Sequence, residues 1–161
     1  MNSGWMGSRA TITKEPCISS FATNEEQFKR RYLDLVKSRH PESFRSDNGA
    51  EEHCFFCIET EETVHGFPDV MEVVSRDGFN HVHFYEFKLS DMCGCIKFQP
   101  TQPAFYKKHK ALNVFVVAYN RQTQFLHIFP VWCLFDEYSP YFLNNGNFLN
   151  LTEAEIKRGY K

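Results

Sequence analysis

Two apolar runs joined by an Asp-Gly pair constrain the fold of this chain more than any other feature. Residues 70–74 and 82–87 are rich in Val, Phe and Tyr, as strands are. Asp77-Gly78 lies between them, and these two residue types tolerate the positive φ that a type I′ hairpin turn requires. We therefore expect an antiparallel hairpin in which Asp69 lies directly opposite Glu86.

This register brings acidic and basic side chains together. Asp69 and Glu86 would have Cβ atoms about 5 Å apart, and Lys88 would share the face of Glu86. Two carboxylates can hold Mg²⁺ or Mn²⁺ together with phosphate oxygens, and a nearby ammonium can orient water or offset developing charge. A Pro-Asp turn followed by a solvated Glu-Lys ion pair is the alternative. The neighbouring Phe84 and Phe87 favour the metal site, because buried charges require a partner or a metal.

The motif Gly66-Phe67-Pro68-Asp69, followed after sixteen residues by Glu86-Phe87-Lys88, resembles the PD-(D/E)xK nuclease superfamily. Its form is similar to archaeal-type Holliday junction resolvases and to virus-type replication-repair nuclease domains, over residues 24–131. The resemblance implies an α/β fold with a restriction-endonuclease-like core, a mixed central β-sheet flanked by helices. It also implies a metal-dependent DNA endonuclease. Asp69 and Glu86 would hold the metal with the backbone carbonyl of Phe87, and Lys88 would position the attacking water.

A predicted helix over residues 24–38 offers a further acidic residue. Its apolar stripe consists of Phe28, Tyr32, Leu35 and Val36. Thr23 and Glu26 fit a capping box, whereas Glu25 lies close to the middle of the stripe at about 100° per residue. Because the resemblance implies an acidic metal ligand from this helix, Glu25 is the candidate. A first-turn acid favoured by the helix dipole explains Glu25 equally well.

The segment after the hairpin predicts a helix over residues 104–112, with Thr101 as its cap, and buried strands over 113–119 and 125–129. Gln102 stands where the resemblance implies a glutamine at the start of this helix. There it would orient Lys88, water or a phosphate oxygen. With a further strand over residues 53–59, the order of helix, three strands, helix and two strands agrees with the core of the superfamily.

Length and composition are compatible with one domain. A chain of 161 residues with 42% hydrophobic residues can bury a core, and no apolar run approaches the length of a membrane span. Residues 1–15 lack periodicity and a signal-peptide apolar region, so we expect a flexible tail. Residues 16–161 would form the nuclease-like domain, with residues 132–161 as an appendage. The appendage would end in a short helix over 152–159, where Thr152 and Glu155 fit a capping box and Gly159 is the stop. The expected location is intracellular: cytoplasmic, or nuclear in a eukaryote or its virus.

The charge balance restricts how the chain can bind nucleic acid. A formal net charge of -2 argues against a protein that coats DNA, because phosphate contacts require local Lys or Arg. The candidate contacts are Lys97, Lys107, Lys108 and Lys110, with Lys29, Arg30 and Arg31 on the first helix. A solvated helix face explains each cluster nearly as well. By analogy with the resolvases, the partner would be branched DNA cut by a homodimer.

Four cysteines support a competing interpretation. Cys54, Cys57, Cys93 and Cys95 form two close-set pairs that could provide a closed structural zinc site in a non-catalytic nucleic-acid-binding module. Alternation along a strand would send the first two to opposite faces, so buried free thiols in a reducing compartment are the default. A further alternative is an RNA endonuclease of the same superfamily, similar to the cap-snatching enzymes, which also use Pro-Asp and metal carboxylates.

Overall fold

The computed structural model describes residues 10–19, 23–39, 51–58, 66–76, 78–143 and 146–160. The strands are β1 (Thr11–Lys14), β2 (Glu51–Cys57), β3 (Val70–Arg76), β4 (Phe79–Leu89), β5 (Cys95–Lys97), β6 (Val114–Tyr119), β7 (Phe125–Pro130) and β8 (Phe148–Asn150). The helices are α1 (Pro16–Ser19), α2 (Glu25–Arg39), α3 (Thr101–Lys108), the 3-10 helix η2 (Val131–Phe135) and α4 (Leu151–Lys157).

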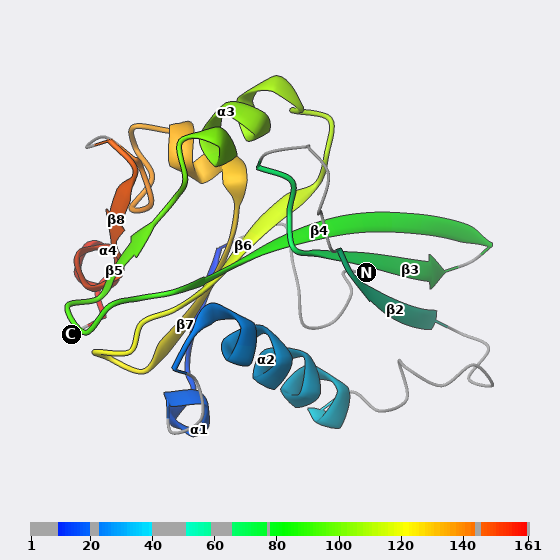
Figure 1. Cartoon of the computed structure of the whole chain (residues 1–161), viewed down its shortest axis with the longest axis horizontal. Coiled ribbons are helices and arrows are strands. Elements are labelled where there is room, and N and C mark those ends of the chain that lie inside the picture. Colours follow the sequence, from blue (N-terminus) through cyan, green and yellow to red (C-terminus); the bar gives the residue numbers. More distant parts are fainter. Residues whose placement is uncertain are drawn as a thin grey trace.

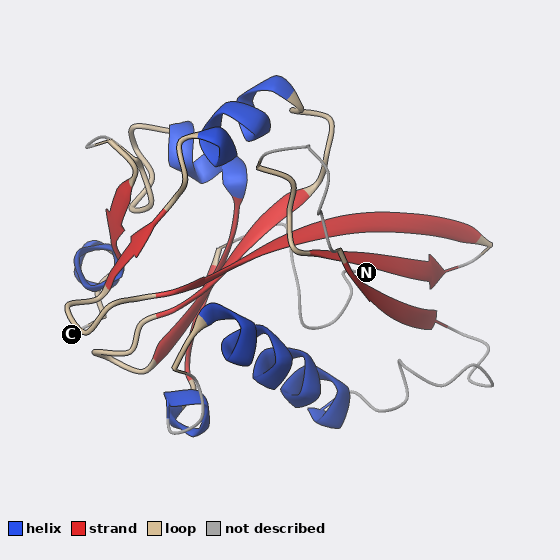
Figure 2. Cartoon of the chain, in the orientation of Figure 1, coloured by secondary structure: helices blue, strands red, loops and turns tan. Residues whose placement is uncertain are grey.

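Within these residues the chain is a mixed α/β structure built on a six-stranded sheet in the order β1-β7-β6-β4-β3-β2 (Figure 1). The β4–β6 pair is parallel and the other neighbours are antiparallel, so the predicted mixed sheet flanked by helices is confirmed. A small second sheet pairs β5 with β8, away from the large one (Figure 2). No helix in the described ranges has the length and apolar character that a membrane crossing requires.

The β3–β4 hairpin has the predicted register. Arg76 pairs with Phe79 and Val70 pairs with Tyr85, which leaves a two-residue connection. Gly78 has φ of 78°, as a turn of this kind requires, while Asp77 lies outside the described residues. The parallel partner β6 lies on the other edge of β4, so β4 is an interior strand of the sheet.

Alternation along β4 divides its side chains between two layers. Tyr85 and Phe87 pack with Phe28 and Tyr32 of α2, on one face of the sheet. Glu86 and Lys88, which alternate with them, lie on the opposite face, toward α3. Figure 1 shows α2 below the sheet and α3 with η2 above it. The candidate site therefore lies in the α3 layer.

The N-cap of α2 is Asn24, one residue after the predicted cap Thr23. The Asn24 side chain, and not Thr23, accepts the backbone N–H of Gln27 at 2.9 Å. The Gln27 side chain accepts in turn from the backbone and hydroxyl of Thr23, at 3.0 and 2.7 Å. Glu26 instead forms ion pairs along the helix with Lys29 and Arg30. Asn is as good a cap as Thr, so the sequence pattern fitted two adjacent registers.

The other two predicted helix starts also need correction. Thr101 is the first residue of α3 and Pro100 holds the cap position without a side-chain bond, and the helix ends at Lys108 rather than at residue 112. At α4 the cap is Asn150, which accepts the Glu153 backbone N–H at 3.0 Å. Glu155, which fitted a capping box, points into the protein interior instead.

The predicted flexible tail extended too far along the chain. β1 pairs with β7 and buries Ile12. Both carboxylate oxygens of Glu15 accept from the Arg39 guanidinium, at 2.6 and 2.8 Å, and the Glu15 carbonyl accepts from the Tyr119 hydroxyl at 2.8 Å. A four-residue edge strand with one buried side chain gives almost no periodic signal, which explains the error. Residues 1–9 lie outside the description.

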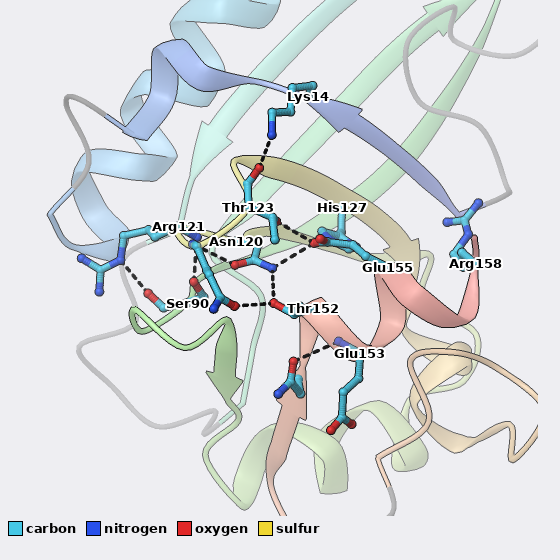
Figure 3. Close-up of polar contacts among 12 residues, drawn as sticks. Lys14, Ser90, Asn120, Arg121, Thr123, His127, Thr152, Glu153, Glu155 and Arg158 are labelled. Atoms are coloured by element: carbon cyan, nitrogen blue, oxygen red, sulfur yellow. Dashed lines mark hydrogen bonds and ion pairs between the residues drawn. The ribbon is translucent and has the colours of Figure 1, made fainter. Parts of the chain in front are cut away.

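A buried carboxylate fixes the C-terminal segment to the sheet (Figure 3). Oε2 of Glu155 accepts from His127 Nε2 at 2.6 Å, from Asn120 Nδ2 at 2.9 Å and from the Thr123 hydroxyl at 3.0 Å. His127 Nδ1 lies 2.8 Å from the Tyr141 hydroxyl, so a neutral imidazole donates to Glu155 and accepts from Tyr141. α4 is thus joined to the large sheet by a polar network centred on Glu155.

Candidate functional site

Glu86 lies at the centre of the predicted site and is only 2% exposed. Its Oε1 accepts from the Gln102 amide at 2.6 Å and lies 3.6 Å from Lys88 Nζ. Its Oε2 is buried and has no hydrogen-bond partner among the described residues. Burial and the nearby Asp69 carboxylate raise the pKa of Glu86 to about 8, against the opposing effect of Lys88. Without a cation, this carboxyl group is therefore mainly protonated at neutral pH.

Gln102 joins the carboxylate to the ammonium. Its Oε1 accepts from Lys88 Nζ at 2.9 Å and from the backbone N–H of Gln99 at 2.8 Å, while its Nε2 donates to Glu86. The Lys88 ammonium also lies 5.1 Å from the centre of the Phe98 ring. The structure thus brings three of the predicted residues into one bonded chain. Since one amide contacts both the Glu86 and the Lys88 side chains, it fixes their relative positions.

Asp69 lies immediately before β3 and is half-buried. Its Oδ2 accepts the backbone N–H of Phe87 at 3.0 Å, which ties it to the residue between the two other charged positions. Burial raises the pKa of Asp69, while the Phe87 hydrogen bond and the charges of Lys29 and Lys88 oppose the shift. Because the charge of Lys29 lowers the pKa of Asp69, α2 contributes a cation to this region in addition to the Glu25 carboxylate.

The loop that carries Asp69 is clamped against α3. Gly66 has φ of 91°, and a Cβ at this position would lie 2.4 Å from the Thr101 carbonyl oxygen and 2.8 Å from Phe105 Cβ. The next residue, Phe67, makes edge-on ring contacts with Phe84 and Phe105, each with centroids 5.5 Å apart. Only glycine accommodates this approach, so the motif glycine positions the aspartate loop on the helix that carries the glutamine.

Glu25 is exposed as a residue, but its carboxylate faces the same group of charges. Burial raises the pKa of Glu25 and the Asp69 carboxylate raises it further, whereas Lys88 and the backbone N–H of Leu89 lower it. The influence of Lys88 and Asp69 shows that the first turn of α2 reaches the end of β4. The predicted acidic residue therefore lies at the edge of the site.

The sequence analysis missed Tyr106, which belongs to the same site. Its hydroxyl is buried and has no hydrogen-bond partner among the described residues. Burial, then the charges of Glu86 and Asp69 and a side-chain interaction with Glu86, raise the pKa of Tyr106, so its hydroxyl faces the Glu86 carboxyl. Tyr106 follows Gln102 by four residues on α3, a spacing that puts both on one helix face. That spacing was the available signal.

The donor set suits a hard divalent cation held by few protein ligands. Within the described ranges, no three His, Cys, Asp or Glu side chains are grouped as a metal site. Mg²⁺ rarely needs such a cage, since it is bound through one or two carboxylates, water and substrate phosphates. The unpartnered Glu86 Oε2 is a buried oxygen donor of the required type. Asp69 and Glu86 are the carboxylates that could hold such an ion.

The structure does not bring the four paired cysteines together. Cys54 and Cys57 lie on β2 at one edge of the large sheet, whereas Cys93 and Cys95 lie beside β5, at the other end of the molecule (Figure 1). None of them belongs to a metal-binding group. The default of buried thiols is wrong as well, because only Cys133 of the six cysteines is buried.

The predicted nucleic-acid contacts divide between two places. Lys97 ends β5 and its ammonium lies 5.6 Å from the Phe148 ring centre. Lys107, Lys108 and Lys110 are exposed around the C-terminal end of α3. Lys107 and Lys110 border a separate pocket between α3 and η2. The four predicted lysines therefore do not form one cluster.

No protein-family model, curated protein or solved structure matches this chain. The interpretation of the site therefore depends on its own motif, geometry and electrostatics. These bring Asp69, Glu86, Lys88 and Gln102 together on the α3 side of the sheet, with Glu25 at the edge.

Proposed function

We propose that the protein is a divalent-metal-dependent DNA endonuclease with a restriction-endonuclease-like core of the PD-(D/E)xK type. The observation that carries the proposal is the state of Glu86, a buried carboxyl with one unpartnered oxygen, linked through Gln102 to Lys88. A purely structural ion pair would have its buried oxygens satisfied. The order of α2, β2, β3, β4, α3, β6 and β7 also supports this core.

Each residue has a role that its contacts support. Asp69 and Glu86 would hold Mg²⁺ or Mn²⁺ with the Phe87 carbonyl, and Glu25 would add negative charge at the edge. When bound, the ion supplies Lewis-acid stabilisation of charge on the phosphate and a more acidic water. Lys88 donates hydrogen bonds to the attacking water or to the developing negative charge. Gln102 keeps the Lys88 ammonium in position, since it accepts from Nζ at 2.9 Å.

The substrate class is the least constrained part of the proposal. The resolvase-like motif favours branched DNA, and two symmetric cuts would require two sites and hence a homodimer. The same groups would hydrolyse RNA equally well, because neither the carboxylates nor the ammonium contacts the sugar in this chemistry. Substrate choice is therefore an outcome of the test.

The test is a cleavage panel with linear, flapped and four-way-junction DNA and with structured RNA, in Mg²⁺, in Mn²⁺ and in chelator. Asp69→Asn and Lys88→Met should each reduce metal-dependent cleavage by at least about 100-fold. Glu153→Gln is the matched control, because this carboxylate is exposed on α4. Cleavage by both site variants at the wild-type rate would refute the assignment. Cleavage of RNA alone would establish the RNA endonuclease instead.

A further inference from the structure

A cavity lies between the C-terminal end of α3 and η2. Its volume is about 490 Å³, within the range of small-molecule pockets. The residues that matter for its chemistry are Tyr106, Lys107, Lys110, Val131, Trp132 and Phe135. The wall is thus largely apolar and aromatic, with two lysines at its border.

The border of this pocket carries an exposed aromatic ring and free positive charge. Trp132 is 58% exposed, although it is the largest apolar side chain type. Lys107 Nζ lies 5.0 Å from the centre of the Phe135 ring. In the described part of the chain, neither Lys107 nor Lys110 forms an ion pair with a carboxylate. A flat aromatic group that carries a phosphate complements this combination, since aromatic rings stack on bases and ammonium groups bind phosphate.

The pocket and the candidate site share one side chain. Tyr106 lines the pocket, and its hydroxyl lies close to Glu86. Val114, which also lines the pocket, pairs with Phe84, two residues before Glu86 on β4. The pocket and the candidate site therefore lie along the same strand pair, on the side of α3. A nucleic-acid strand bound at the site would have a neighbouring nucleotide near the pocket.

We propose that this pocket binds one unpaired nucleotide of the strand that is cut at Glu86. The base stacks against Trp132 and the aromatic wall, and its phosphate contacts Lys107 and Lys110. The base must be unpaired, because both faces of a base are covered by its neighbours within a duplex. This inference rests on the proposed nuclease function for the identity of the strand, and it makes a single-stranded segment part of the recognised substrate.

The experiment measures binding in chelator, so that cleavage plays no part. The chain has two tryptophans, and Trp5→Phe leaves Trp132 as the sole tryptophan, whose emission is excited selectively over tyrosine. The probes are a single-stranded DNA oligonucleotide, its blunt duplex and deoxyadenosine 5′-monophosphate. The single strand should quench Trp132 saturably, and the duplex should bind about 10-fold more weakly or worse. Lys107→Ala/Lys110→Ala should weaken single-strand binding by about 10-fold.

The control removes the same charge elsewhere. Lys14 on β1 lies over the Phe125 ring, and Lys157 is exposed on α4. The double variant Lys14→Ala/Lys157→Ala therefore tests the effect of losing two positive charges away from the pocket. An equal loss of affinity in this control would overturn the proposal, as would the absence of a saturable Trp132 response. Quenching by the mononucleotide but not by the oligonucleotide would overturn the assignment to a strand. Equal affinity for the duplex would overturn the requirement for an unpaired base.

The two proposals fail separately in this design. Asp69→Asn should retain the Trp132 response in chelator while it loses cleavage. A wild-type protein that cuts no substrate but binds single strands through Lys107 and Lys110 would refute the nuclease function and leave the nucleotide pocket standing. Cleavage with no pocket response would refute the pocket alone.

Discussion

Glu86 and Glu155 are two buried carboxylates, each 2% exposed, in opposite environments. Burial alone would raise the pKa of Glu155, but hydrogen bonds from His127, Asn120 and Thr123 outweigh it and leave the pKa lowered. Glu86 accepts one hydrogen bond, has an unpartnered oxygen and titrates at about 8. The same side chain is thus charged and satisfied beside His127, and uncharged and incomplete beside Lys88, although both lie in one part of the sheet.

The difference separates structural carboxylates from a candidate site. Glu72 is a third buried carboxylate, and its two oxygens contact His53 Nδ1 and the Tyr85 hydroxyl, each at 2.7 Å. Glu72 and Glu155 therefore have the partners that a folded protein normally supplies to buried polar atoms. Glu86 alone of these three lacks one, next to Asp69 and Lys88. A perturbed, incompletely bonded group of this kind is characteristic of functional sites.

The largest expected difference is in the free energy of unfolding at pH 7 in chelator. Glu155→Gln should lose about 2–4 kcal/mol, because it disturbs three hydrogen bonds to a buried charge. Glu86→Gln should lower the free energy of unfolding by less than about 1 kcal/mol, or raise it. This substitution replaces a mainly protonated carboxyl with a neutral amide of the same shape. Urea unfolding measures both. Equal losses would remove the distinction between the two sites.

The pH dependence of the free energy of unfolding should also differ between Glu86 and Glu155. The folded-state pKa of Glu86 is raised from its ordinary 4.5 to about 8, so its contribution to stability is complete below about pH 4.5 and is lost as the pH rises through 8. The folded-state pKa of Glu155 is lowered, so its contribution is present above its ordinary 4.5 and is lost as the pH falls through the lowered pKa.

We therefore expect metal-free protein to lose about 3 kcal/mol between pH 6 and pH 9 through Glu86. Unfolding curves at a series of pH values should show a smaller alkaline loss in Glu86→Gln and a smaller acid loss in Glu155→Gln. An alkaline loss of unchanged size in Glu86→Gln would mean that Glu86 does not titrate as described.

Metal should stabilise the site through Glu86 and not through Glu155. At a Mn²⁺ concentration ten times the Kd, binding to the folded state adds about 1.4 kcal/mol. Glu86→Gln and Asp69→Asn should lose this gain in unfolding experiments with and without MnCl₂, whereas Glu155→Gln should keep it. The gain should increase from pH 6 to pH 8, because the proton on Glu86 competes with the metal. A pH-independent gain would contradict this competition.

The smallest effect concerns Glu25. Glu25 is exposed and contributes negative charge from the edge of the site. Glu25→Gln should therefore reduce Mn²⁺ affinity by about 2- to 5-fold. Glu26→Gln is the matched control, since Glu26 is bonded to Lys29 and Arg30 on the same turn. Calorimetric titration with Mn²⁺ distinguishes the two. A loss as large as that of Asp69→Asn would make Glu25 a full ligand.

The hairpin and its register could be predicted because they depend on local signals. Asp77-Gly78 sets the turn and alternation sets the faces, so Glu86 and Lys88 had to share a side. The approach of Gln102 followed from the resemblance and agrees with the observed contacts. What could be predicted is therefore the part that a few neighbouring residues determine.

Long-range packing determines the rest. Glu155 fitted a helix cap in sequence, but His127 and Asn120, which bond it, are 28 and 35 residues away. β1 joins the sheet through its pairing with β7, which lies more than a hundred residues further along the chain. Tyr106 showed its role only once α3 lay over Glu86. No local pattern contains these contacts.

The most direct test of the central claim is the single-turnover rate of Mn²⁺-dependent cleavage by Glu86→Gln and Glu155→Gln, at a temperature where both variants are folded. The account predicts that Glu86→Gln loses at least about 100-fold in rate, while Glu155→Gln cuts at nearly the wild-type rate. Cleavage by Glu86→Gln at the wild-type rate, or an equal loss in both variants, would contradict it.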